Sequence, residues 1–316
     1  MSRARSVRAA VLAVLAVLAV LVLAGLAACG GTAAARPERP TVAAPPAPAP
    51  DGRRWVLDPA GSDEFDGSGP VDPARWDTTR ADRGFAADGA PFNGRIERAY
   101  YRPENARRED GELVLSVRAE PPTTVQGLRY DFSSGMVHRG RRYPLVRRAG
   151  VPVYLEARMF VPAGAHGLWP AFWLVAAAHD DPVFREENQV PEVDVVEFWA
   201  DGRTRDWQRP WSNLHRWEGG RVVHEDERAY GTPALGAWHT YGVFLDDERI
   251  VPYFDGVPQP QAGRAVPLPA GEPMDVVLNL AVARCRGHAR SCSEPEFGSP
   301  AGLAVRVDHV REYHLR

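Results

Sequence analysis

The sequence predicts an all-β fold, either a sandwich or a barrel, within one large domain. Short runs of alternating apolar and polar residues are separated by Gly, Pro, Asp and Asn, and no convincing amphipathic helix pattern interrupts them. With 316 residues, of which 44% are hydrophobic, the chain can bury a sizeable core. Many strands joined by frequent turn signals are typical of sandwiches and barrels. The clearest strand candidates are residues 112–119, 153–161, 171–176, 192–199, 238–245, 275–283 and 303–313.

The first 28 residues have the pattern of an export signal. Arg3, Arg5 and Arg8 precede an apolar run over residues 9–28, and small residues stand before a cleavage point. The sequence LAAC that ends at Cys29 resembles a bacterial lipobox, in which the cysteine is acylated and becomes the new N-terminus. The alternative is an uncleaved transmembrane helix, since about 20 apolar residues can span a bilayer. We therefore expect an exported lipoprotein, anchored to the cell membrane on its extracytoplasmic side.

Residues 29–52 have the composition of a linker. They are dominated by Ala, Pro and Gly, which cannot form a core and tend to extend as a polyproline-like spacer. The folded domain is then expected to cover residues 53–316. Loss of the signal would remove three arginines and no acids, which makes the formal net charge of −3 more negative by three units. This mild acidity argues against nucleic acid or an anionic membrane surface as a partner.

The basic residues and the cysteines limit the chemistry further. All 38 basic residues are arginine, so a lysine nucleophile or a Schiff base is excluded. If Cys29 is acylated, Cys285 and Cys292 remain as a pair, and an exported protein is expected to join them in a disulfide. The alternative is a metal site, for which His288 lies between them but the usual paired CxxC spacing is missing.

Three carboxylates, Glu192, Asp194 and Glu197, lie close together in a stretch whose spacers are all valine. Valine is β-branched and favours a strand. On a regular strand Glu197 would face away from the other two, but a β-bulge adds one residue and returns it to their face. The two glutamate backbones would then lie ~13 Å apart. Leaning side chains could close their carboxyl groups to the ~5–5.5 Å of a retaining glycosidase pair. The alternatives are a solvated sheet face and a calcium site.

An aromatic stretch upstream, GLWPAFWL at residues 167–174, strengthens the glycosidase interpretation, because aromatic faces near a row of acids suit a sugar ring. Together with PEVDVVE at residues 191–197, it resembles glycoside hydrolase family 16, the laminarinase-like β-glucanases and relatives, in the variety that contains the bulge. The resemblance extends along nearly the whole domain, through the segments SDEFDG (62–67), DGEL (110–113), WHTY (238–241) and VDHVR (307–311). It implies a β-jelly-roll sandwich of two curved antiparallel sheets, with the substrate cleft on the concave face.

The resemblance also assigns roles to the three acids. It makes Glu192 the nucleophile, Glu197 the general acid/base and Asp194 a helper between them. Repulsion among three neighbouring carboxylates raises the pKa of at least one of them, which suits an acid that must hold its proton near neutral pH. The sequence departs from the family's pattern around the cleft, where Pro191 precedes the first glutamate and residues 200–227 match no subfamily.

Three further residues are candidates for contact with the substrate. Trp169 and Trp173 could stack on sugar rings, and their spacing allows both to reach the cleft, but they could equally belong to the core. By resemblance, His215 lies on the strand after the catalytic one, where it could contact the sugar or Asp194, or serve as a structural histidine.

The reaction itself requires no cofactor, but many relatives hold one structural calcium ion on the convex side. The ligands that the resemblance implies are Glu64, the Gly111 carbonyl and Asp308, and oxygen ligands of this kind suit calcium.

We therefore expect a monomeric, retaining endo-glycoside hydrolase of a β-linked polysaccharide, most directly a β-1,3- or mixed-linkage glucan. Two alternatives within the enzyme class are a galactan hydrolase and a transglycosylase that remodels a cell-envelope polysaccharide. An alternative of another class is a non-catalytic carbohydrate-binding lipoprotein. Such a binder needs aromatic residues but has no need of the three acids.

Overall fold

The structure, a computed structural model, describes residues 45–49, 52–80, 89–92, 96–140, 142–164, 167–177, 190–198, 208–218, 221–260, 268–284 and 298–316, with the side chains of 190, 217 and 221–227 left out. The chain separates into Met1–Ala43 and a compact unit Ala44–Arg316, and all described residues belong to the second unit. The residues that are described include no helix long and apolar enough to cross a membrane. The predicted signal, residues 1–28 with Cys29, lies outside them.

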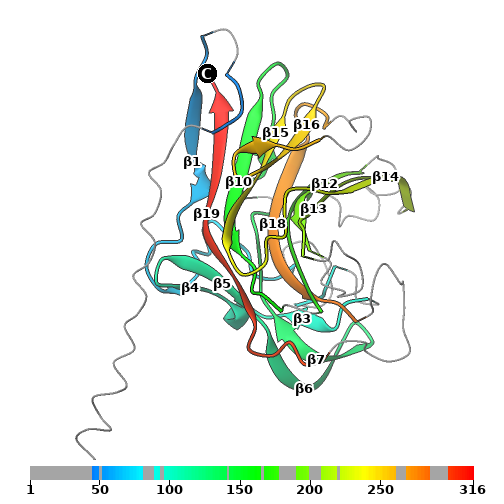
Figure 1. Cartoon of the computed structure of the whole chain (residues 1–316). Coiled ribbons are helices and arrows are strands. Elements are labelled where there is room, and N and C mark those ends of the chain that lie inside the picture. Colours follow the sequence, from blue (N-terminus) through cyan, green and yellow to red (C-terminus); the bar gives the residue numbers. More distant parts are fainter. Residues whose placement is uncertain are drawn as a thin grey trace, which may run out of the picture. The chain divides into compact units, whose positions relative to one another are not determined.

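The larger of two main sheets contains nine of the described strands, all paired antiparallel. Its order is β17-β16-β15-β10-β19-β5-β4-β2, with β1 paired to β19 (Figure 1). These strands are β1 (Trp55–Asp63), β2 (Gly69–Pro70), β4 (Ala106–Glu109), β5 (Glu112–Ser116), β10 (Val153–Phe160), β15 (Trp238–Leu245), β16 (Ile250–Phe254), β17 (Val257–Pro258) and β19 (Ala304–Leu315).

The second main sheet has seven described strands in the order β14-β13-β12-β11-β18-β8, with β9 paired to β18. Its members are β8 (Met136–His138), β9 (Leu145–Val146), β11 (Leu168–Ala176), β12 (Val190–Glu197), β13 (Trp211–Glu218), β14 (Arg221–Ala229) and β18 (Pro273–Val282). A small third sheet, β3-β7-β6, contains the parallel pair β3–β7. It consists of β3 (Ala99–Tyr101), β6 (Arg118–Val125) and β7 (Leu128–Ser134), and the short 3-10 helix η2 (Pro103–Asn105) follows β3.

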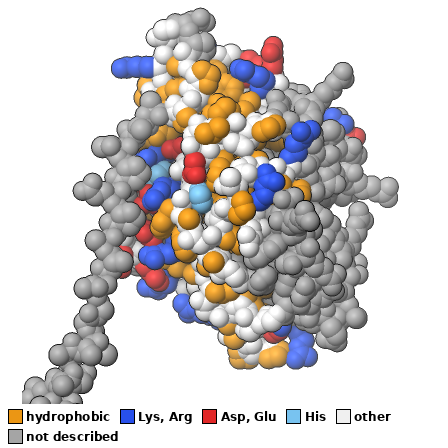
Figure 2. Space-filling model, viewed as in Figure 1, with side chains coloured by type: hydrophobic (Ala, Val, Ile, Leu, Met, Phe, Trp, Pro, Cys, Tyr) orange, Lys and Arg blue, Asp and Glu red, His pale blue; other side chains and the backbone are white. Residues whose placement is uncertain are grey.

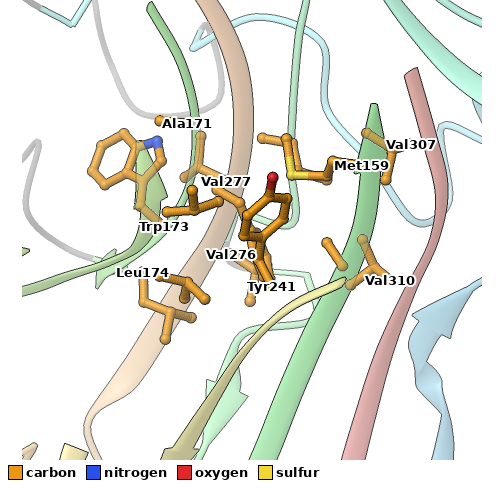
Figure 3. Close-up of a cluster of buried hydrophobic side chains, with 14 of the residues drawn as sticks. Met159, Ala171, Trp173, Leu174, Tyr241, Val276, Val277, Val307 and Val310 are labelled. Atoms are coloured by element: carbon orange, nitrogen blue, oxygen red, sulfur yellow. The ribbon is translucent and has the colours of Figure 1, made fainter. Parts of the chain in front are cut away.

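The core lies between the two main sheets. Figure 3 shows part of it, in which Met159, Tyr241, Val307 and Val310 come from the nine-stranded sheet and Leu174 and Val276 from the seven-stranded sheet. Val277, also labelled there, lies across from Trp173 on the other face of the seven-stranded sheet. Side chains alternate along each strand, so one face of each sheet supplies this core while the other face is left for other contacts. Outside the core, Figure 2 shows arginine and acidic side chains interspersed on one face of the molecule.

The predicted all-β fold is confirmed, and most of the predicted strands are found within two or three residues of their expected ends. Residues 238–245 match β15 at both ends. The prediction of one continuous strand over residues 112–119 is wrong, because β5 ends at Ser116 and β6 begins at Arg118 in a different sheet. The alternating pattern continues through the break, since Val117 itself is buried.

The expected start of the domain at residue 53 also needs correction. Ala47, from the segment expected to be a spacer, is buried at 4% exposure against an aromatic cluster. The indole nitrogen of Trp55 donates a 2.8 Å hydrogen bond to the Ala47 carbonyl oxygen. Ala47 packs against aromatic rings, and its carbonyl oxygen gives the partly buried Trp55 N–H a hydrogen-bond partner. The end of the predicted linker therefore belongs to the folded unit. The cluster consists of Tyr154, Phe244, Tyr253 and Tyr313, with Trp55, Leu57 and Val251 at its edge.

Candidate active site

The three acids lie on β12, and the register of its neighbours shows the predicted β-bulge. On β11, Ala171, Trp173 and Val175 follow each other in steps of two, and on β13 so do Trp211, Asn213 and His215. Across from them on β12 lie Glu197, Asp194 and Glu192, with one extra residue between the first two and register shifts against both neighbours. Directly paired residues share a face of a sheet, so the bulge places all three acids in one row. This prediction is confirmed.

The row faces away from the other main sheet. Phe198, the residue after Glu197, packs edge-on against Tyr241 of β15, with ring centroids 6.0 Å apart. Because neighbours on a strand face opposite sides, Glu197 points outward from the core. Glu192 is half-buried, while Asp194 and Glu197 are each only 6% exposed. Backbone support comes from Tyr230, whose hydroxyl donates a 2.7 Å hydrogen bond to the Val195 carbonyl within the bulge.

Both carboxylate oxygens of Glu197 accept a hydrogen bond. The indole nitrogen of Trp169 donates to Oε2 at 2.6 Å, and the side-chain nitrogen of Asn213 donates to Oε1. Trp169 thus contacts Glu197, which favours the cleft over the core among the two alternatives that the sequence left open, and stacking on a sugar stays a prediction. Asn213 was missed as a site residue. A polar residue two positions before His215 on the same strand was the available signal, because such residues share a face.

His215 contacts two of the acids. Its Nε2 lies 3.2 Å from Asp194 Oδ2 and 3.9 Å from Glu192 Oε1. Burial lowers the pKa of His215, but the hydrogen bond and charge of Asp194, with the charges of Glu192 and Glu197, outweigh it and raise that pKa to about 10. The imidazole is therefore a cation at neutral pH. The predicted contact with Asp194 is confirmed.

The spacing of this group would also allow a metal ion, since the ligand atoms of Glu192, Asp194 and His215 lie within 4.8 Å of one another. A metal ion bound here would have to displace the proton that Asp194 and Glu192 favour on this histidine. We interpret the group as an acid–histidine cluster and not as a metal site.

Trp173 lies on the same face as the acids, yet it is buried at 8% exposure and belongs to the hydrophobic core cluster. Its indole nitrogen donates a 2.8 Å hydrogen bond to Asn279 Oδ1, and its ring meets Phe92 edge-on, with centroids 4.8 Å apart. Asn279 in turn donates to the Tyr101 hydroxyl at 2.9 Å. Of the two predicted alternatives, the structure favours packing for Trp173, and contact with a sugar stays a prediction.

The residues predicted to bind calcium have other partners in the structure. Arg311 donates to both oxygens of Glu64, at 2.8 and 3.0 Å, and Arg158 lies 3.4 Å from Asp308 Oδ2. The Gly111 backbone nitrogen donates to the Gly67 carbonyl at 2.8 Å, but this hydrogen bond does not involve the Gly111 carbonyl oxygen that was predicted as a ligand. A guanidinium beside each carboxylate does not fit a divalent cation, because its charge already neutralises the donor. Calcium binding therefore stays a prediction that this arrangement does not favour.

Cys285 and Cys292 lie outside the described residues, as does His288 between them. The disulfide accordingly stays a prediction.

The fold and the acid row are those of a sandwich-type carbohydrate-active protein, and comparisons with known proteins agree. The family model described as Glycosyl hydrolases family 16 matches residues 153–292. A β-glucanase of Rhodothermus marinus is 36% identical over 270 residues, which cover 80% of this chain and 83% of that protein. An endo-1,3-1,4-β-glycanase, ExsH, of Rhizobium meliloti (strain 1021) is 31% identical over 207 residues, 64% of this chain.

Among solved structures, an endo-β-1,3-glucanase from Pyrococcus furiosus superposes with a TM-score of 0.64 at 25% identity, covering 84% of this chain and 97% of that one. The chain belongs to glycosyl hydrolase family 16, and its fold is the β-jelly roll of two antiparallel sheets. It spans 38% of the length of the R. meliloti protein.

Proposed function

We propose that this chain is a retaining endo-glycoside hydrolase that cleaves a β-linked polysaccharide, with a β-1,3- or mixed-linkage glucan as substrate. The observation that carries the proposal is the single row of Glu192, Asp194 and Glu197 across the bulge of β12. Membership of a glycosyl hydrolase family supports it, and so do the names of the similar proteins, β-glucanase and endo-1,3-1,4-β-glycanase.

In the first step, Glu192 attacks the anomeric carbon and forms a covalent glycosyl intermediate, while Glu197 gives its proton to the leaving glycosidic oxygen. In the second step, Glu197 takes a proton from water, and the water releases the sugar from Glu192 with its original configuration. Glu192 is the more exposed of the two glutamates, which suits the residue that must reach the anomeric carbon.

The His215–Asp194 pair supports this division of roles. The imidazolium lies between Asp194 and Glu192, at 3.2 and 3.9 Å, and its positive charge offsets part of the repulsion among the acids. Glu192 can then stay ionised as a nucleophile in the presence of a second carboxylate. The pair also fixes the imidazole against the row, because buried Asp194 on β12 holds partly buried His215 on β13 at 3.2 Å.

We further propose that the protein is exported and held at the membrane by an acyl chain on Cys29, that Cys285 and Cys292 form a disulfide, and that the domain acts as a monomer. The charged start, the apolar run over residues 9–28 and the LAAC sequence support the anchor. Replacing Cys29 with serine is expected to release the protein from the membrane fraction or to leave its precursor uncleaved, and unchanged size and fractionation would contradict the anchor.

The test of function is a polysaccharide panel. The full-length protein in detergent is incubated with laminarin, lichenan, agarose and κ-carrageenan, and new reducing ends and product lengths are measured. The proposal predicts rapid shortening of laminarin or lichenan, and none with the Glu192→Gln variant. Cleavage of only the galactans would replace the substrate by a galactan, and binding without cleavage would make the protein a carbohydrate-binding lipoprotein.

A further inference from the structure

The side chain of Asn213 is buried beside the proposed acid, and only one of the two polar atoms of its amide has a hydrogen-bond partner among the described residues. Asn213 is 1% exposed and lies on β13 directly across from Asp194. Its Nδ2 donates to Glu197 Oε1, while its Oδ1 is buried and has no hydrogen-bond partner among the described residues. A buried polar atom without a partner is costly, so its retention next to a reacting group calls for an explanation.

The two donors to Glu197 differ in what they can do. The indole of Trp169 can only donate, so its hydrogen bond to Oε2 has one direction in every state of the acid. An asparagine amide carries a donor and an acceptor on the same carbon, and half a turn about its last side-chain bond exchanges them. With Oδ1 unpartnered, the bond from Nδ2 to Glu197 is what orients this amide.

We propose that Asn213 is a positioning residue that holds the Glu197 carboxyl group in both of its protonation states by rotating its amide. When Glu197 is ionised, Nδ2 donates to Oε1, as in the structure. When Oε1 carries the proton, Oδ1 turns toward it and accepts the O–H hydrogen bond. The inference rests on the proposed function for its role in catalysis, but the rotation itself depends only on the titration of Glu197.

The proposed cycle accounts for the proton at each step. Before cleavage, the proton is on Oε1 and bonds to Oδ1, until the glycosidic oxygen of the substrate replaces Oδ1 as acceptor. As the proton leaves for that oxygen, Oε1 becomes negative, and the amide turns its N–H toward the new charge. The donated hydrogen bond then holds the carboxylate while it acts as a base toward water. The proton taken from water restores the first arrangement.

The charged groups around Glu197 cannot serve as both hydrogen-bond donor and hydrogen-bond acceptor to its carboxyl group. On its own strand are Asp194 and Glu192, and from β13 the imidazolium of His215 faces the row. The charges of these groups act on Glu197, and the charge of Glu197 in turn helps to raise the pKa of His215. The imidazolium donates its Nε2 proton toward the carboxylates of Asp194 and Glu192. Asn213 is the described neighbour of Glu197 that offers both a donor and an acceptor at one oxygen.

The first test measures the pKa of Glu197 without any substrate. Carboxyl 13C NMR on full-length protein labelled at Glu, with the signal assigned by Glu197→Gln, follows the titration in the wild type and in Asn213→Ala. The variant loses hydrogen bonds in both states, but the bond to the ionised form is about twice as strong. We expect the pKa of Glu197 to rise by about 0.7 units, a change of about fivefold in its protonation equilibrium.

Ser212→Ala is the matched control. Ser212 is also buried on β13, and its hydroxyl donates a 2.9 Å hydrogen bond to the Asp194 carbonyl oxygen rather than to Glu197. Its loss is expected to lower stability without moving the titration of Glu197. If Asn213→Ala titrates like the wild type and the control, or moves the pKa downward, the proposal is wrong.

The second test uses the wild type and keeps the proposal open to refutation if Asn213→Ala does not fold. Neutron diffraction from crystals held below and above the pKa of Glu197 locates the deuterium atoms of the Asn213 amide. We expect Oδ1 to face Oε1 in the acidic crystal and Nδ2 to face it in the basic one. The same amide orientation at both pH values would overturn the rotation. Neither measurement needs turnover. If the protein cleaves no polysaccharide, the proposed function is refuted, but the two measurements still test the rotation of the Asn213 amide.

Discussion

Two strands of this sandwich, β12 and β19, both carry buried carboxylates, but they neutralise them differently. On β19, Glu312 is 3% exposed and lies 2.5 Å from the guanidinium of Arg139 and 2.8 Å from Nε2 of His314, so a permanent cation is one of its two partners. On β12, Asp194 is matched to His215, and the oxygens of Glu197 accept hydrogen bonds from a neutral indole and a neutral amide. Arginine keeps its charge at every relevant pH, whereas histidine and asparagine can change their proton or their orientation.

The difference separates a structural acid from a reactive one. Burial raises the pKa of Glu312, but hydrogen bonds from His314 and Arg139 and their charges outweigh this effect and lower it, so the acid stays ionised. A permanent ion pair suits a carboxylate that must never change state. An acid that gives and takes a proton in each cycle needs neighbours that tolerate both states, and β12 supplies them.

The largest effect is expected on β12. Glu192→Gln removes the proposed nucleophile while keeping its shape, so turnover of the preferred polysaccharide should fall by at least about 10³-fold. Because one of three neighbouring carboxylates becomes neutral, the melting temperature should stay the same or rise. Reducing-end assays and thermal unfolding measure the two quantities. Near-normal turnover would mean that the acid row is not the catalytic group.

The reverse pattern is expected on β19. Glu312→Gln leaves the buried Arg139 charge without its partner, which should lower the free energy of unfolding by about 3–5 kcal/mol. Turnover per folded molecule should not change. Glu104→Gln is the control, because Glu104 and Arg102 form an exposed pair at 3.1 Å that should contribute under about 1 kcal/mol. Denaturant unfolding compares the variants, and equal losses in both would contradict the assignment of a buried structural pair.

The histidine on β13 predicts a pH dependence. Since folding raises the pKa of His215 from 6.5 to about 10, its contribution to stability is complete below pH 6.5 and is lost as the pH rises toward 10. The slope contributed by this one proton is up to about 1.4 kcal/mol per pH unit. Unfolding free energies measured across this window should fall more steeply for the wild type than for His215→Gln. Parallel curves would show that the imidazole does not gain its proton on folding.

The smallest effect is expected where residues 45–49 pack on the nine-stranded sheet. Trp55→Phe keeps the ring but removes the N–H that bonds the Ala47 carbonyl, at an expected cost of about 0.5–1.5 kcal/mol. The segment should then open more often, and hydrogen exchange at Ala47 and Ala49 should become faster. Trp238→Phe is the control, since Trp238 packs against Arg158 instead. Equal exchange in the two variants would place the contact outside the folded unit.

The sequence allowed the fold class and the acid row to be predicted because both depend on local pattern. Valine spacers indicate a strand, and the one-residue excess before Glu197 indicates a bulge, without knowledge of the neighbours. The partners could not be predicted in this way. Asn213 reaches Glu197 only through the register between β12 and β13, and Asn279 reaches Trp173 through the register between β11 and β18.

The same limit explains why the predicted bounds of the strand 112–119 and of the linker 29–52 were wrong. Hydrophobic alternation continues through Val117, so it could not show that the chain leaves one sheet for another there. Composition made residues 29–52 a spacer, whereas Ala47 finds an aromatic surface formed by strands far along the chain. Contacts set by long-range packing are invisible to periodicity, which reports only which face a residue takes.

The central claim is that Glu192 and Glu197 act from one face of a bulged strand with separate roles. Proton NMR of products released in the first minutes from a β-glucan tests it most directly, supported by azide added to Glu192→Ala and Glu197→Ala with an activated substrate. The account predicts that the β-anomer appears first. It also predicts that azide gives a β-configured glycosyl azide with Glu197→Ala, where the nucleophile remains, whereas any azide product of Glu192→Ala has the inverted, α-configuration. An α-anomer as the first product, or azide rescue of Glu192→Ala with the same β-configured product, would contradict it.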